Sequence, residues 1–195
     1  MVFLRSVSPI ETGPVIYAGE IYLRAPQMND YVQWSNLREV SRDFLIPWEP
    51  AWPKDDLIRS AYRRRVRRYQ RDIREDRAYP FFVFRSSDDE FLGGLTLSNI
   101  RRGVAQACSL GYWVGKPYAR QGYMVSAVSS ATSFVFDTLH LHRLEAACIP
   151  KNRASINLLK KCGFTEEGYA REYLLINGTW HDHKLFARLA SEDTP

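Results

Sequence analysis

LGYWVGKPYARQGYM, residues Leu110 to Met124, holds the clearest structural signal in the chain. A strand-like run leads through a proline-bearing turn to a glycine at the start of a helical segment. The first N–H groups of a helix have no partner within the helix and lie at its positive end, so they bind anions such as a pyrophosphate. The amides concerned belong to Arg120, Gln121, Gly122 and Tyr123. The same pattern is also typical of a plain structural turn.

A second stretch, IPKNRASINLLKKCGF from Ile149 to Phe164, begins about 30 residues further on. A strand ends there at a proline, and Asn152 is placed to cap the helix that follows. Ser155 lies three residues later, in the first helical turn. Gly163 is the expected C-cap. The two stretches together predict two strand-to-helix units in sequence.

An arginine-rich segment from Asp55 to about Arg77 precedes these units. Its apolar residues recur at steps of four, four, three and four, which predicts an amphipathic helix. A shorter helix is expected at 29–37, and a proline-rich connector at 44–53. The remaining expected elements are strands at 81–85, 91–97, 107–114 and 143–149, a helix at 122–139, and a hairpin of 169–176 with 180–189 turning at Asn177-Gly178. This order predicts one mixed α/β domain.

Composition excludes several classes of protein. The 195 residues are 45% hydrophobic, enough for one sizeable core. The longest uncharged run, 121–136, is 16 residues long, too short and too polar to span a bilayer, so no membrane contact is expected. The N-terminus lacks the apolar run of an export signal. Three cysteines without CxxC spacing argue against a disulfide framework. A reduced, cytoplasmic protein is therefore expected.

The net charge of +5 is concentrated in one segment. Lys54 to Arg77 contains ten basic and five acidic residues, so the rest of the chain sums to zero. Clustered guanidinium groups bind phosphate backbones or acidic protein surfaces. Such a helix can contact a phosphate backbone or an acidic protein surface. The alternative is a solvated helix face balanced by Asp72, Glu75 and Asp76.

The order of elements, with the late N-x-x-S and GF motifs, resembles the GNAT superfamily of N-acetyltransferases. FLIPWEP, LSNIRRG, ACSLGY and EGYAREYLLINGTWHDH (Glu167 to His183) are similar to the ribosomal-protein-alanine N-acetyltransferases within it. The similarity covers nearly the whole chain from about Ile21. It implies a single N-acetyltransferase domain over 1–195, with 1–20 a variable N-terminal extension. The implied fold is a central mixed, mostly antiparallel sheet flanked by about four helices.

This resemblance implies acetyl-CoA as cosubstrate and no metal. Two central strands would part, and the pantetheine arm would add to the edge formed by Tyr112, Trp113 and Val114. The pyrophosphate would lie on the turn at 120–123, and Asn152 and Ser155 complete the predicted cofactor-binding set. Ala119 and Met124 depart from the family pattern, but backbone amides hold the pyrophosphate, so binding is expected to survive.

The implied reaction is direct attack of an N-terminal alanine amine of a ribosomal protein on the thioester. Such a substrate would offer the basic helix, Lys54 to Arg77, ribosomal RNA or an acidic protein surface as a possible contact. An α-amine has a pKa of about 7.7 to 8.0, so little help from a base is needed. Backbone N–H groups near Trp113 or Val114 would stabilise the oxyanion. Many relatives place a proton-donating tyrosine where this chain has Leu159. The resemblance implies Ser155 as the catalytic substitute, because the matching serine is implicated in ribosomal-protein acetyltransferases. The alternative is that Ser155 only caps the helix.

Glu49, between Trp48 and Pro50, is the second predicted catalytic residue. Its carboxylate would orient the substrate N-terminus and accept its proton through water. Alternatively, it is a surface carboxylate paired with an arginine. Asp182, flanked by His181 and His183, is a weaker candidate of the same kind. The carboxylate that a relative carries on the penultimate strand is replaced here by Leu174, which leaves Glu49 or a water relay as the possible base.

Two other classes of function stay open at this point. One is a GNAT enzyme that acetylates a small-molecule amine. The other is a non-catalytic module that binds acyl-CoA or the ribosome. The sequence is compatible with a monomer or a dimer.

Overall fold

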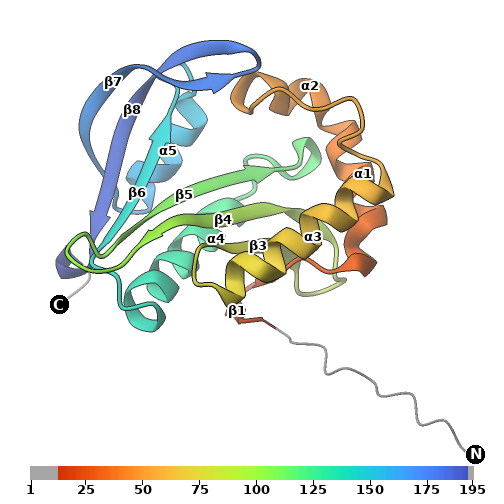
Figure 1. Cartoon of the computed structure of the whole chain (residues 1–195), viewed down its shortest axis with the longest axis horizontal. Helices are drawn as coiled ribbons and strands as arrows, with labels where there is room; N and C mark the ends of the chain where they lie inside the picture. Colours follow the sequence, from red (N-terminus) through yellow and green to blue (C-terminus); the bar gives the residue numbers. More distant parts are fainter. Residues whose placement is uncertain (1–12, 193–195) are drawn as a thin grey trace, which may run out of the picture.

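The computed structural model describes residues 13–192, which form one eight-stranded sheet with helices on both faces (Figure 1). The strand order is β1-β2-β3-β4-β5-β6-β8-β7, and every neighbouring pair is antiparallel except β5 with β6. The strands are β1 (Val15–Ala18), β2 (Ile21–Arg24), β3 (Tyr79–Arg85), β4 (Phe91–Arg101), β5 (Ala107–Val114), β6 (Arg143–Cys148), β7 (Thr165–Ile176) and β8 (Thr179–Leu189). The predicted mixed, mostly antiparallel sheet is confirmed.

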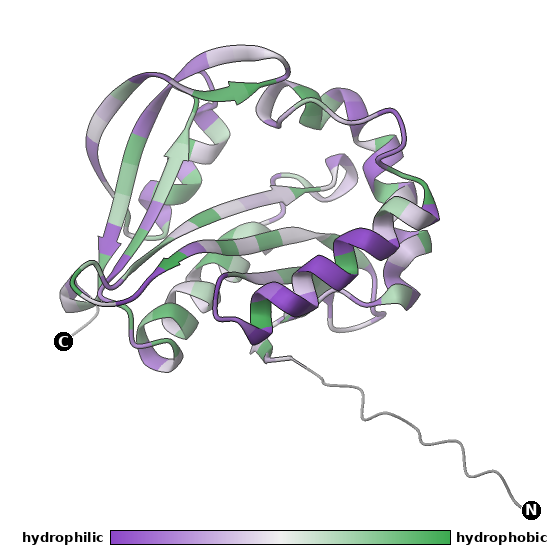
Figure 2. Ribbon diagram, viewed as in Figure 1, coloured by the Kyte–Doolittle hydropathy of each residue, from purple (hydrophilic) through white to green (hydrophobic). Residues whose placement is uncertain are grey.

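The helices are α1 (Tyr31–Val40), α2 (Arg42–Leu45), α3 (Arg59–Arg74), α4 (Tyr123–Ser133) and α5 (Arg153–Lys161). α1 and α3 cover one face of the sheet, while α4 and α5 cover the other (Figure 1). Successive side chains of β3 point to opposite faces of the sheet, so this strand packs against the helices on both faces. Phe82 and Phe84 pack with Trp34 and Tyr62, whereas Val83 belongs to the cluster beneath α4. Figure 2 shows hydrophobic segments on the central strands and a largely hydrophilic α3.

β5 and β6 separate part-way along their length. They pair in parallel only from Ala107 opposite Arg143 to Leu110 opposite Ala146. Beyond that point β5 pairs with β4 alone and β6 with β8 alone, so the two strands diverge as a V (Figure 1). α1 packs against the far end of β5, where Leu37 occupies the space that a side chain on Gly115 would need.

Several element boundaries differ from those expected. The arginine-rich helix begins at Arg59, because Asp55 and Asp56 lie in a preceding turn where they pair with arginines of the next helical turns. The helix expected at 122–139 is α4 followed by a π-helical turn, Phe134–Thr138. Within 13–192, no helix is both long and apolar enough to cross a membrane.

The first two strands were not predicted from the sequence. Each is four residues long, too short for a periodic signal, and is stabilised by pairing with a neighbour. The first of these strands falls within the expected N-terminal extension, 1–20. Residues 1–12 lie outside the described residues, and Val15–Ala18 form the edge strand of the sheet.

Candidate active site

The free edge of β5 beyond Leu110 forms one wall of the site. Side chains alternate along this edge, so Tyr112 and Val114 pack with the α4 layer and Trp113 packs with the α1 layer. All three side chains are partly buried. Since no strand pairs with this edge on the β6 side, its backbone groups are available to an extended amide-bearing ligand. The residues predicted to hold the pantetheine arm therefore lie where such a ligand would add.

A hydroxyl pair spans the opening of the V. The Tyr112 hydroxyl lies 2.7 Å from Ser155 Oγ, which comes from the first turn of α5. Asn152 Oδ1 accepts the Ser155 backbone N–H at 3.1 Å, so Asn152 caps the helix and leaves the serine hydroxyl facing the tyrosine. Burial raises the pKa of Tyr112 above the usual phenol value, although the hydrogen bond with Ser155 opposes the shift. The phenol therefore stays protonated at neutral pH and can donate a proton.

Sequence reasoning missed the Tyr112 hydroxyl as a functional group, having assigned only its backbone. Leu159, at the position where many relatives carry a tyrosine, is fully buried in the core beneath α5. The structure places a phenol beside Ser155 from the opposite strand instead. A signal was available, since period-two alternation puts Tyr112 on the face that α5 covers.

The turn before α4 presents exposed backbone at the other end of the edge. Gly122 has a φ of 89°, a left-handed conformation that favours glycine, and Arg120 also lies in this region with a φ of 65°. Arg120, Gln121 and Gly122 are solvent-exposed, and Tyr123 is half-buried. Among residues 13–192, no atom lies within 4 Å of the position that a Gly122 side chain would occupy. This space is open to an anion at the α4 N-terminus.

Changing Gly122 to alanine tests this turn. Because the added methyl group meets no protein atom, its steric effect falls on a bound pyrophosphate. The backbone strain costs about 1 kcal/mol, a shift of about 2 to 4 °C in Tm. We expect the Kd for coenzyme A, measured by calorimetry, to rise about tenfold, well beyond what that strain alone predicts. Serine at Ala119 is the matched control, and an unchanged Kd in Gly122→Ala would contradict the assignment.

Glu49 lies in a cluster with Arg38 and two tryptophans. Arg38 Nη1 and Nη2 donate to Glu49 Oε1 and Oε2 at 2.8 and 2.7 Å, and Trp52 Nε1 donates to Oε2 at 2.8 Å. The Arg38 guanidinium lies 3.9 Å from the Trp52 ring centroid and 4.8 Å from that of Trp113. Glu49 is thus paired with an arginine, as its alternative interpretation predicted. A carboxylate has about four acceptor positions, so one remains for an incoming donor.

The β7–β8 hairpin closes over this cluster. The turn residue Asn177 donates its backbone N–H to the Glu49 carbonyl at 3.0 Å, which joins two loops far apart in the sequence. Asp182, the other candidate carboxylate, is engaged within the hairpin. It accepts the Tyr169 hydroxyl at 2.6 Å and the Glu172 N–H at 2.8 Å, contacts that hold its pKa below the usual range. Glu49 is the carboxylate linked through Arg38 to the β5 edge.

A family model described as an acetyltransferase (GNAT) domain matches residues 20–165. The chain belongs to the GNAT acetyltransferase family. Membership confirms the expected class of enzyme, an acetyl-CoA-dependent N-acetyltransferase. The parted strands and the exposed turn before α4 fit such a cosubstrate, because one offers an unpaired strand edge and the other a set of backbone amides.

Relatives of this GNAT enzyme cover most of its length. It is 36% identical over 155 residues to the [ribosomal protein uS5]-alanine N-acetyltransferase of Escherichia coli, covering 80% of each chain. It is 35% identical over 173 residues to the probable N-acetyltransferase YjcK of Bacillus subtilis, covering 89% of this chain and 96% of YjcK. The structure of Mycobacterium smegmatis RimJ in complex with CoA-disulfide has a TM-score of 0.86 at 31% identity, covering 94% and 89% of the two chains.

In the described part of this GNAT enzyme, residues 13–192, no three His, Cys, Asp or Glu side chains come together in an arrangement that could hold a metal ion. The His183 side chain is buried, and burial lowers its pKa. Its Nδ1 lies 2.9 Å from the His181 carbonyl.

Proposed function

We propose that this GNAT enzyme transfers the acetyl group of acetyl-CoA to the N-terminal α-amine of an alanine in a ribosomal protein. The relationship to the E. coli uS5-alanine enzyme, over 80% of both chains, supports the acceptor. The 2.7 Å contact of Tyr112 with Ser155 across the parted strands carries the chemical part of the proposal. Since ribosomal proteins are made in the cytoplasm, the enzyme would act there.

The reaction is a direct displacement. Pantetheine adds to the β5 edge at Tyr112, Trp113 and Val114, and the pyrophosphate lies on the amides at 120–123, with Asn152 holding the start of α5. The neutral amine attacks the thioester carbon, and a backbone N–H at Trp113 or Val114 stabilises the oxyanion. The C–S bond then breaks. The Ser155 hydroxyl donates a proton to the thiolate and is resupplied by Tyr112. The amine loses a proton to water, and Tyr112 regains a proton from water.

Glu49 and Arg38 form the proposed binding site for the substrate N-terminus. The fourth acceptor position of Glu49 would take an ammonium N–H or, through water, the proton of the attacking amine. Arg38 Nε is buried and, among residues 13–192, is the one buried side-chain nitrogen or oxygen atom without a hydrogen-bond partner. A peptide carbonyl in the cleft would satisfy it. A buried unpaired donor is costly, so such an atom favours a bound acceptor.

The acceptor class can be tested with peptides. An Ala-starting ribosomal peptide and an Nα-blocked peptide carrying one lysine are compared at pH 7.5 by release of the CoA thiol. With amine pKa values of about 7.8 and 10.4, the neutral fractions differ by about 250-fold. We expect kcat/KM to favour the Ala peptide by at least that factor. A small amine such as spermidine turning over faster would overturn the proposed acceptor, and absence of thiol release with every amine would overturn the proposed function.

A further inference from the structure

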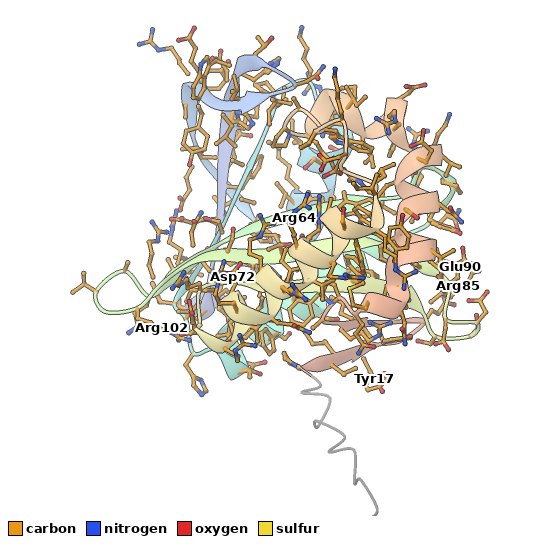
Figure 3. The ribbon with its side chains drawn as sticks, turned by 45° about the vertical axis from the view of Figure 1, so that its right-hand side comes forward. Tyr17, Arg64, Asp72, Arg85, Glu90 and Arg102 are labelled. Carbon is orange, nitrogen blue, oxygen red and sulfur yellow. The ribbon has the colours of Figure 1, made fainter. Side chains whose placement is uncertain are left out.

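α3 carries a continuous arginine surface on the side away from the sheet. We define the arginine face as the seven exposed arginines of this helix: Arg59, Arg63, Arg64, Arg67, Arg68, Arg71 and Arg74. Figure 3 shows α3 lying across the front of the sheet with Arg64 and Asp72 on it, and Arg102 beside its C-terminal end. In Figure 2 the same helix is mostly hydrophilic.

Helix periodicity arranges these side chains in rows. Tyr62 and Val66 are buried against the sheet, and the arginine face covers roughly the half-turn opposite them. Arg63, Arg67 and Arg71 follow one another at intervals of four residues, a rise of about 6 Å each, and the face extends over about 22 Å from Arg59 to the end of the helix. The result is a straight band of positive charge.

Little acidic charge neutralises this band. The helix contains eight arginines and one acidic residue, Asp72. Ion pairs are made by Arg64 with Asp55 and by Arg65 with Asp56. In the described chain, six arginines of the face make no ion pair: Arg59, Arg63, Arg67, Arg68, Arg71 and Arg74. Adjacent unpaired charges repel one another, so an anionic partner is favoured.

The lack of apolar groups on this face identifies the kind of partner. Protein interfaces have an apolar core surrounded by a polar rim. Between Arg59 and Arg74 no large hydrophobic side chain is exposed. Interfaces with nucleic acids are more polar and much more positively charged than those between proteins. Guanidinium groups also match phosphate geometry with two N–H donors.

We propose that the arginine face binds the phosphate backbone of RNA without reading its sequence. This inference goes beyond the proposed acetyl transfer and does not depend on it. α3 lies on the face of the sheet opposite α4 and α5, so RNA and the cosubstrate occupy different sides of the molecule (Figure 1). An enzyme with this surface would reach acceptor proteins that are already on an RNA scaffold.

The test is the salt dependence of RNA binding. The variant carries R63Q, R67Q, R71Q and R74Q, changes that keep good helix formers at exposed positions. Binding of a labelled single-stranded RNA is measured by fluorescence anisotropy from about 50 to 200 mM KCl. Each neutralised phosphate contributes about 0.7 to the slope of log K against log salt, so four contribute about 2.8. We expect the slope of the variant to be smaller than the native slope by about 2.8. The native Kd should rise at least about 50-fold over the same range of salt.

Two matched variants accompany it. R85Q, R101Q and R171Q together remove three positive charges away from α3, and this variant is expected to bind RNA with nearly the native slope. Lysine at the four α3 positions keeps the charge and is expected to retain most of the slope. Circular dichroism and turnover of the Ala peptide check that each variant is folded, and this turnover should not change in the glutamine variant.

Two results would overturn the proposal. One is native RNA affinity and slope in the folded glutamine variant. The other is binding of polyglutamate at least as tight as binding of RNA, which would identify an acidic protein surface as the partner. If the native enzyme does not acetylate the Ala peptide, the acetyl-transfer proposal is contradicted, whereas the RNA-binding result is unaffected.

Discussion

Phenylalanine at Tyr112 is expected to lower kcat about 100-fold while leaving the Kd for acetyl-CoA within about twofold. The substitution keeps the ring packed on the α4 side of β5 and removes only the hydroxyl that lies 2.7 Å from Ser155 Oγ. Without it, Ser155 cannot be resupplied with the proton that it passes to the departing thiolate. The cosubstrate is held through the backbone of β5, so binding is preserved.

Ser155→Ala provides the partner measurement. It should lower kcat to a similar extent, and the double variant should be scarcely slower than either single variant, because the two hydroxyls act as one unit. Turnover is followed by thiol release at saturating acetyl-CoA, and Kd by calorimetry. Thr at Ser155 is the conservative control, since it retains a hydroxyl and should keep a substantial part of kcat.

The outcome separates catalysis from structure. If Tyr112 and Ser155 only packed the start of α5, the variants would lose stability together with cosubstrate affinity and would keep kcat for the enzyme that remains folded. Retention of kcat within about twofold in both single variants would contradict the proton-donor role. Because burial raises the pKa of Tyr112, the native kcat should also show no loss from deprotonation of this phenol as the pH rises from 7 to 9.

Methionine at Arg38 is expected to destabilise the protein by about 3 kcal/mol, a fall of about 10 °C in Tm. The Arg38 and Glu49 side chains are only 7% and 19% exposed, so removing the arginine leaves a carboxylate largely without solvent or a countercharge. The contacts of the guanidinium with the Trp52 and Trp113 rings are lost as well. Thermal unfolding followed by circular dichroism measures the effect.

A double-variant cycle isolates the ion pair. Arg38→Met with Glu49→Leu should recover much of the stability lost by the single change, because no unpaired charge is left. Both the single and the double variant should have a higher KM for the Ala peptide than the native enzyme, since the proposed binding site for the substrate N-terminus is gone. Equal stabilities of the single and double variants would show that the unpaired Glu49 carboxylate does not destabilise the Arg38→Met protein. An unchanged peptide KM in both variants would contradict the proposal that Glu49 and Arg38 bind the substrate N-terminus.

Local features predicted a large part of the fold. Asn152 caps α5 as expected, Gly122 adopts the left-handed conformation that the turn before α4 requires, and the strand predicted at 107–114 is observed with those bounds. In each case the signal comes from residues close together in the sequence, through capping, backbone conformation or side-chain alternation. The short strands β1 and β2 carry no such signal and were missed.

Composition and spacing were therefore sufficient for the order of the longer elements, the helical phase of α3 and the exposure of most of its arginines. These properties follow from backbone geometry and from the burial of one helix face. The pairing of Tyr112 with Ser155, and of Glu49 with Arg38, arose from the fold. Tyr112 and Ser155 are 43 residues apart and meet because β5 and β6 diverge and α5 lies over the gap. Glu49 meets Arg38 because α1, which carries the arginine, packs against the end of β5. Contacts of this kind depend on long-range packing, which local sequence patterns do not encode.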